Sequence, residues 1–287
     1  MKAVIFGSSG QDGYYLSQLL LQQGCEVIGV SRNGHTVGDI SNFDQTSDVI
    51  KKNKPEYIFH LAANSTTRHD SLFENHSTIA TGTLNVLESV NKFSPQSKVF
   101  ISGSGLQFKN SGEPIKETDE FEARDVYSVS RIQSVYAARY YRSLGMKVYV
   151  GYLFNHESPR RSEQHISKMI AECAKRIQAG SHEKIQIGDI GVIKEWIFAG
   201  DTVKGIMTLI SQENIFEANI GSGVGYSIED WLFACFQFIG KDWKNHVSTR
   251  ENFIPDYKKL ISDPSLIKSL SWKPKLSFTD LAKLMMQ

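Results

Sequence analysis

The sequence predicts an α/β fold, in which a doubly wound parallel sheet is followed by a smaller, mixed α/β lobe at the C-terminal end. Two observations point to it. Up to about residue 153, short runs rich in β-branched and aromatic residues alternate with segments of helical periodicity. After Phe154 this alternation stops, and polar, arginine-rich and short apolar stretches follow. A chain of 287 residues is long enough for one large domain and a small lobe.

The first strand runs into a glycine-rich turn, Gly7-Ser8-Ser9-Gly10-Gln11-Asp12-Gly13, and a helical pattern starts directly after it. This order places the N-terminus of a helix against a pyrophosphate. We expect Gly7 to form the tight turn, Gly10 to admit the phosphates and Gly13 to let the helix pack closely on the strand. A strand over residues 25–31 completes a βαβ unit, so the turn predicts a Rossmann-like dinucleotide site.

The remaining elements are expected in alternation. The expected strands are 57–61, 98–101 and 147–153, and the expected helices are 44–51, 72–90, 126–141 and 166–177. In the C-terminal part we expect short strands within 185–198, helices over 201–211 and 227–239 capped by Asp201 and Ser227, and a last helix. Residues 1–154 would form the dinucleotide-binding domain, to which some later segments return, and residues 155–287 mainly the substrate lobe.

Composition argues against several kinds of partner and site. The net charge of +1 gives no bulk attraction to nucleic acid. No apolar run approaches the roughly 18 residues of a membrane span, and the strand at the N-terminus argues against a signal peptide. Cys25, Cys173 and Cys235 lack metal or redox spacing, so we expect inert thiols, no metal site and a cytoplasmic location.

The end of the second strand indicates which dinucleotide binds. It reads Ser31-Arg32, and no acidic residue follows before Asp39. An acidic side chain there would bind a ribose 2′-hydroxyl, whereas Arg32 favours a 2′-phosphate and hence NADP; the alternative is a solvated loop arginine. We expect Asp39 and Ile40 to meet the adenine. At the end of the third strand, residues 60–63 leave small side chains beside the cofactor.

Tyr127 and Arg131 are the strongest candidates for catalysis. Four residues apart on a helix, they share a face, and the fixed cation favours the phenolate. Such a tyrosine can exchange a proton with a carbinol or ketone while a nicotinamide exchanges hydride. Ser102 and Ser104, after the fourth strand, are expected to hydrogen-bond the same oxygen.

These residues carry a resemblance to the extended short-chain dehydrogenases/reductases and, within them, to the GDP-mannose 4,6-dehydratase family. The matching stretches are the glycine turn, Leu61-Ala62-Ala63-Asn64-Ser65, Gly82-Thr83-Leu84, Leu153-Phe154-Asn155-His156-Glu157-Ser158-Pro159-Arg160-Arg161 and Ser271-Trp272-Lys273-Pro274. The fourth stretch is long and unusual, and the resemblance covers nearly the whole chain.

The resemblance implies a role for individual residues. The pyrophosphate would be held by residues 7–12, the 2′-phosphate by Arg32, and the adenine by Asp39 and Ile40. The rest of the cofactor site would be lined by Leu61, Ala62, Ala63, Asn64, Ser65, His76, His156 and Arg161. Asn155, Lys168 and Lys194 would face the nucleotide sugar, unless they form a basic surface patch.

The chain departs from the family at four places. Gly103, Ser104 and Gly105 stand where the family has Thr-Ser-Glu, so the general base for elimination is missing. Arg131 replaces a lysine, and Ile254 replaces an arginine that contacts the diphosphate, for which Arg250 is the candidate substitute. The link between Arg32 and Gly38 is also shorter than the family's subunit-contacting insertion.

The sequence therefore predicts an NADPH-dependent reductase of a GDP-linked 4-keto-6-deoxy sugar, either hexose or heptose. Hydride would go to sugar C4, Tyr127 would donate the proton, and Ser104 or Ser102 would orient the ketone. The alternatives are a diverged dehydratase or epimerase and a non-catalytic, cofactor-binding partner subunit. By analogy we expect a homodimer through the helices at 81–93 and 126–141.

Overall fold

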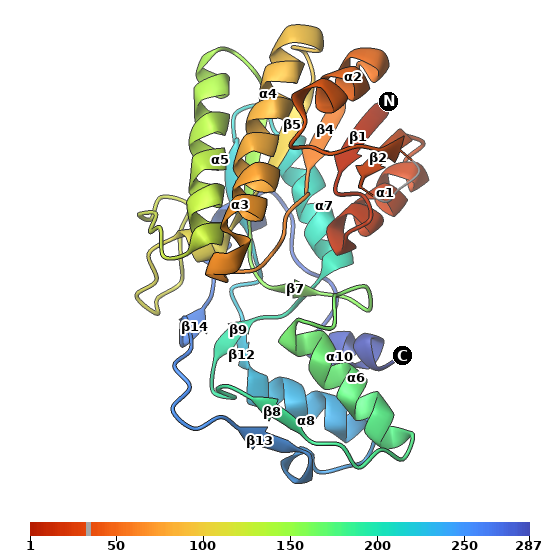
Figure 1. Ribbon diagram of the computed structural model, residues 1–287, viewed down its shortest axis with the longest axis vertical. Helices are drawn as coiled ribbons and strands as arrows, with labels where there is room; N and C mark the ends of the chain where they lie inside the picture. Colours follow the sequence, from red (N-terminus) through yellow and green to blue (C-terminus); the bar gives the residue numbers. More distant parts are fainter. Residues whose placement is uncertain (33–35) are drawn as a thin grey trace.

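The computed structural model describes residues 1–32 and 36–287, and it shows a large α/β unit joined to a smaller lobe (Figure 1). The large unit is built on a sheet whose described strands are all parallel, in the order β11-β6-β5-β4-β1-β2-β3. The bounds are β1 Lys2–Phe6, β2 Glu26–Ser31, β3 Thr36–Val37, β4 Tyr57–His60, β5 Lys98–Ser104, β6 Val148–Leu153 and β11 Glu217–Ile220. This confirms the predicted doubly wound fold.

Helices cover both faces of the sheet because successive strand residues point to opposite sides and both sides are apolar. Ala3 and Ile5 pack in the core beneath α1 (Gln11–Gln22), α7 (Ala199–Ile210) and α9 (Ser265–Ser269). Val4 and Phe6 pack in the opposite core, beneath α2 (Phe43–Asn53), α4 (Gly82–Phe93) and α5 (Val126–Ser143). A short helix α3 (Leu72–Asn75) and a π-helical turn over His76–Thr81 lead into α4.

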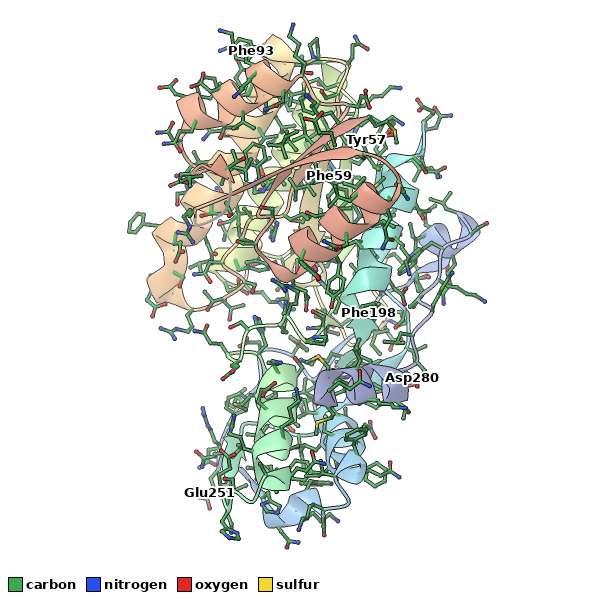
Figure 2. All side chains as sticks on the ribbon, turned by 90° about the vertical axis from the view of Figure 1, so that its right-hand side faces the viewer. Tyr57, Phe59, Phe93, Phe198, Glu251 and Asp280 are labelled. Carbon is green, nitrogen blue, oxygen red and sulfur yellow. The ribbon has the colours of Figure 1, made fainter. Side chains whose placement is uncertain are left out.

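The smaller lobe has its own core, which α6 (Ile166–Gln178), α8 (Ile228–Phe238) and α10 (Phe278–Met286) enclose. At its centre the rings of Trp196 and Trp231 stack with 4.5 Å between centroids. Its short strands are β8 Ile185–Ile187, β9 Ile193–Glu195, β12 Gly225–Ser227, β13 Val247–Thr249 and β14 Lys259–Leu260. Strand β7 (His156–Glu157) pairs with β10 (Ile197–Phe198) where the chain passes between the units. Figure 2 shows Phe198 at this junction, with Phe93 near one end of the molecule and Glu251 near the other.

The predicted caps have different outcomes. Ser227 does cap α8, since its hydroxyl accepts a hydrogen bond from the Asp230 backbone N–H. The predicted Asp201 cap is wrong, because α7 begins at Ala199 and Asp201 lies inside its first turn. The Asp201 carboxylate instead accepts hydrogen bonds from the backbone N–H groups of Lys275 and Leu276, at 2.7 and 2.9 Å. It therefore anchors the C-terminal tail to the large unit.

Two further differences concern the strands and the described range. Strand β5 runs on to Ser104, beyond the expected Ile101, because residues 102–104 stay in register with β6. Most of the short link between Arg32 and Gly38, residues 33–35, lies outside the described residues. Within the described chain, no helix combines the length and the apolar character needed to cross a membrane.

Candidate active site

A cleft of about 500 Å³ lies at the carboxyl ends of β1, β4, β5 and β6, where the large unit meets the segment leading into the lobe. A second hollow of about 230 Å³ adjoins it along the glycine turn. The hollow contains Arg32, Asp39 and Ile40, and it shares Gly7, Ser9, Gly10, Leu61 and Ala63 with the cleft. Together they form an elongated site across the sheet edge, the position at which doubly wound folds bind dinucleotides.

The glycine turn has the geometry that its spacing predicts. Gly7 has a φ of +89°, and a Cβ there would lie 2.6 Å from the backbone nitrogen of Ala62. A Cβ at Gly13 would lie 2.3 Å from the carbonyl oxygen of Gly7, so helix α1 packs against the turn more closely than any side chain permits. Helix α1 starts at Gln11, and its N-cap residue, Gly10, provides no side-chain cap. Its first N–H groups are therefore available to an anion, which fits a dinucleotide pyrophosphate.

Asp12 and His156 form an ion pair at this helix N-terminus. His156 Nε2 lies 2.8 Å from Asp12 Oδ1, and His156 Nδ1 lies 2.7 Å from the carbonyl oxygen of Phe154. A carboxylate and a carbonyl only accept hydrogen bonds, so both ring nitrogens must carry a proton and His156 is an imidazolium. Burial opposes this charge, but the attraction and hydrogen bond of Asp12 outweigh it and raise the pKa of His156. The ion pair therefore joins β7, which leads into the lobe, to the glycine turn.

The pair makes stability depend on pH in a defined direction. The pKa of His156 is raised above its ordinary value of 6.5, so its contribution to the free energy of unfolding is complete below pH 6.5 and is lost as pH rises through the raised value. The pKa of Asp12 is lowered from 3.8, because His156 and then Arg161 outweigh its burial; its contribution is present above pH 3.8 and lost on acidification. Urea denaturation between about pH 6 and pH 9 should show a steeper loss of stability in the wild type than in His156→Asn. Parallel curves would contradict the assignment of the imidazolium.

Tyr127 and Arg131 come together as predicted, on the first turns of α5 and beside the end of β5. The Arg131 guanidinium lies 5.0 Å from the centroid of the Tyr127 ring, and both side chains are buried at the cleft wall. None of the described residues hydrogen-bonds to the Tyr127 hydroxyl. A phenol without a protein partner, in a cleft and beside a fixed cation, is placed to exchange a proton with a ligand.

Arg131 is anchored by the strand end. Its Nη1 donates to the carbonyl oxygen of Ser102 and, at 2.7 Å, to the Ser102 hydroxyl. That hydroxyl donates in turn to the carbonyl oxygen of His60 at 3.0 Å. Burial, and then the charge of Arg131, lower the pKa of the His60 side chain to about 3, so its ring is neutral. Ser102 is thus committed to holding Arg131, which leaves Ser104 as the serine better placed for a ligand.

The end of β5 and the turn after it contribute the Ser104 hydroxyl to the cleft but no acidic side chain at residues 103–105. The Ser104 hydroxyl accepts a hydrogen bond from the Leu106 backbone N–H at 3.2 Å and lines the cleft. A Cβ at Gly105 would lie 2.8 Å from the Phe154 ring, and one at Gly103 would lie 2.7 Å from the Tyr152 ring. Residue 105 thus carries no carboxylate, and the Tyr152 and Phe154 rings leave little room for side chains at residues 103 and 105.

Most of the predicted site residues lie on the cleft or the adjoining hollow, but six do not. Lining positions are taken by Gly7, Ser9, Gly10, Gln11, Asp12, Arg32, Asp39, Ile40, Leu61, Ala62, Ala63, Ser65, Ser102, Ser104, Tyr127, Arg131, Asn155, His156 and Arg161. Ser8, Asn64, His76, Lys168, Lys194 and Arg250 are outside both linings.

The three lysine and arginine side chains among those six have other surroundings. Lys168 pairs with Glu172 at 2.6 Å, along helix α6. Lys194 is buried with its ammonium 4.6 Å from the centroid of Trp196. Arg250 is on the lobe surface, where its backbone N–H donates to Ile187.

Sequence reasoning missed several lining residues, among them Thr67, Leu106, Arg160, His165 and Leu260. Arg160 could have been found from the sequence, because it belongs to the most specific matching stretch. In the structure its guanidinium lies 3.9 Å from the centroid of the Tyr14 ring. His165 and Leu260 offered none, because only the packing of the lobe brings them to the cleft.

Comparison with known proteins bears on these features. The family model described as GDP-mannose 4,6 dehydratase matches residues 4–285. The protein named GDP-mannose 4,6 dehydratase 2 of Arabidopsis thaliana is 30% identical over 320 residues, which cover 99% of this chain and 85% of the relative. GDP-mannose 4,6-dehydratase of Vibrio cholerae is 26% identical, and the match covers 98% of this chain and 91% of the relative.

Solved structures share the fold at lower identity. RMD from Pseudomonas aeruginosa, complexed with NADPH, superposes with a TM-score of 0.88 at 18% identity, covering 99% of this chain and 97% of that one. UDP-glucose 4-epimerase of Thermus thermophilus, in complex with NAD, superposes with a TM-score of 0.85 at 20% identity. The superposition covers 100% of this chain and 98% of the epimerase chain. Both complexes hold a nicotinamide dinucleotide, on a fold like the one described here.

Proposed function

The chain belongs to the GDP-mannose 4,6-dehydratase family, and from that we propose that it is an NADPH-dependent reductase of a GDP-linked 4-keto-6-deoxy sugar. One observation carries the choice of reaction within the family. The cleft keeps the phenol of Tyr127 and the cation of Arg131, whereas residue 105, at which the resemblance implies the elimination base, is a glycine with the Phe154 ring close to it. Hydride transfer to a ketone needs a proton donor but no base at the neighbouring carbon.

The residues present fit a nicotinamide dinucleotide, because the α1 N-terminus is uncapped and the glycine turn leaves no room for side chains. When bound, the dinucleotide supplies the hydride. Tyr127 donates its hydroxyl proton to the carbonyl oxygen of the sugar, so that C=O becomes CH–OH. Arg131 stabilises the negative charge left on Tyr127, and Ser104 orients the carbonyl. Asn155, which lines the cleft, remains the candidate for a contact with the GDP moiety, whereas Lys168, Lys194 and Arg250 lie outside the cleft lining.

The choice of NADPH rests on Arg32, which lies in the hollow beside Asp39. Arg32 Nη2 is 3.5 Å from Glu74 Oε1, and Glu74 Oε2 accepts a hydrogen bond from Asn64 at 2.8 Å. Both charged side chains are substantially exposed, so the pair is weak and Arg32 can turn to a 2′-phosphate.

We expect Arg32→Ala to weaken NADPH binding about tenfold and to leave NADH binding unchanged, because only NADPH carries the 2′-phosphate. The measurement is a fluorescence titration with each dinucleotide. Glu74→Gln is the matched control, and it should strengthen NADPH binding by removing a neighbouring negative charge. Equal weakening of both dinucleotides by Arg32→Ala would contradict the assignment of NADP.

Dehydration is the second candidate, because the relatives that match 98–99% of the chain carry the name GDP-mannose 4,6-dehydratase. A diverged epimerase and a non-catalytic partner subunit are further alternatives.

The assay that tests the proposal follows NADPH oxidation on a GDP-4-keto-6-deoxy sugar. Turnover to the 4-hydroxy sugar is expected. Binding of NADPH without turnover on any such ketone would favour the partner subunit instead.

We further propose a homodimer formed through α4 and α5, which run side by side along one flank (Figure 1). The large apolar side chains of Leu84, Tyr136 and Tyr140 are exposed on these helices. We place the enzyme in the cytoplasm, where reducing conditions keep the buried thiols of Cys25, Cys173 and Cys235 free.

A further inference from the structure

His165 spans the cleft from the lobe to the large unit. It is the residue that precedes helix α6, and it lines the cleft. Its Nδ1 lies 3.1 Å from Nη2 of Arg161, four residues earlier in the chain. Its Nε2 lies 3.4 Å from the hydroxyl of Ser65, which follows β4 on the opposite wall. One imidazole thus contacts both walls of the proposed cofactor site.

These partners determine the tautomer of His165. A guanidinium can only donate hydrogen bonds, so Nδ1 must accept from Arg161 through its lone pair. The ring proton is then on Nε2, which donates to the Ser65 hydroxyl. Burial, and then the charge of Arg161, lower the pKa of His165 to about 4, in agreement with a neutral ring. His165 therefore differs from His156, whose two acceptors make it an imidazolium.

Arg161 is held from two sides and left open on a third. Its Nη2 donates to His165, and its Nε lies 3.4 Å from Oε2 of Glu157, a carboxylate that is only 1% exposed, in an ion pair without a hydrogen bond. None of the described residues accepts a hydrogen bond from its Nη1, and the side chain lines the cleft. Arg161 lines the same cleft as Gln11 and Asp12, the first two residues of α1, and its charge also helps to lower the pKa of Asp12. The N-terminus of α1 is where the fold places a dinucleotide diphosphate.

We propose that His165 is a positioning residue, which directs the Arg161 guanidinium at the diphosphate of the bound dinucleotide and ties the two walls of the cleft together through Ser65. The inference rests on the dinucleotide binding put forward above. A neutral imidazole suits this role, because it offers the acceptor that Arg161 needs and the donor that Ser65 needs. An apolar side chain offers neither, and it leaves Arg161 to pair with Glu157 alone.

The test compares two substitutions in the full-length protein. His165→Phe keeps a flat ring but removes both hydrogen bonds, and it should raise the Kd for NADPH about tenfold. His165→Gln keeps an acceptor for Arg161 and a donor for Ser65, and it should bind NADPH within about threefold of the wild type. His182→Phe, at an exposed position of the lobe, is the control and should change nothing. Fluorescence titration gives the affinities, and thermal melting shows that each variant is folded.

A double-mutant cycle shows whether His165 acts through Arg161. Arg161→Met alone should weaken NADPH binding, and adding His165→Phe to it should cause little further loss. Fully additive losses, or equal losses for Phe and Gln at residue 165, would overturn the positioning role. A loss of GDP binding instead of NADPH binding would overturn the assignment of the diphosphate. If the wild type binds no nicotinamide dinucleotide, the proposed function itself fails. If the wild type binds NADPH tightly and His165→Phe leaves the Kd unchanged, only the role of His165 fails.

Discussion

Replacing Tyr127 by phenylalanine is expected to lower the rate of ketone reduction by about 10²- to 10⁴-fold, because a positioned proton donor contributes that much to such a step. NADPH affinity should stay within about twofold, since the ring over which Arg131 lies is retained. The measurement is single-turnover oxidation of NADPH on a GDP-4-keto-6-deoxy sugar, with dinucleotide binding titrated separately.

Tyr136→Phe provides the matched control for this experiment. Tyr136 is on the same helix but is 58% exposed and lies outside the cleft lining. Its variant should reduce the ketone at the wild-type rate. If Tyr127→Phe did so too, the proton would have to come from elsewhere, and the role given to Arg131 would fail with it.

The second large effect is expected with GDP-mannose and NADP, where the protein should form no 4-keto-6-deoxy product. Dehydration needs a base to remove the proton beside the oxidised carbon, and a general base of this kind contributes about 10²- to 10⁴-fold. Residue 105, at which the resemblance implies the family's glutamate, is a glycine and carries no carboxylate. Mass detection of the product decides between the two candidate reactions, and its accumulation would contradict a reductase.

A further prediction concerns the effect of a glutamate at residue 105 on activity and stability. Gly105→Glu should not restore elimination by itself, because its Cβ would lie 2.8 Å from the Phe154 ring. Overpacking of this kind costs about 1–3 kcal/mol, so the variant should be less stable. Gly105→Glu combined with Phe154→Ala should lose part of that strain. Dehydratase activity in the single variant would show that the surrounding loop adapts more easily than its packing indicates.

Arg131, at which the resemblance implies a lysine, can still provide the positive charge that the proposed proton transfer needs. Its guanidinium donates to the carbonyl and hydroxyl oxygens of Ser102 at the strand end, while its Cζ lies over the Tyr127 ring. The same group therefore keeps a fixed charge beside the phenol. The cost of the arrangement is that Ser102 is no longer free to orient a ketone.

The sequence by itself determined the glycine turn, the family and five strands of the sheet, β1, β2, β4, β5 and β6. It did not predict the edge strands β3 and β11. Strand and helix periodicities follow from which side of each element is buried, so local patterns suffice to predict them. The turn could be predicted because Gly7 and Gly13 meet steric demands that act within one βαβ unit. The pairing of Tyr127 with Arg131 follows from the helical repeat alone.

Only the tertiary structure decided which polar groups meet across the cleft. Asp12 pairs with a histidine 144 positions away, and Ser65 meets a histidine 100 positions away. Asp201 was predicted as a cap and instead binds backbone groups more than 70 positions later. No local pattern encodes such contacts, because they depend on how the lobe packs on the sheet. The same packing sets the protonation of the two histidines: His156 faces two acceptors and is charged, whereas His165 faces a guanidinium and is neutral.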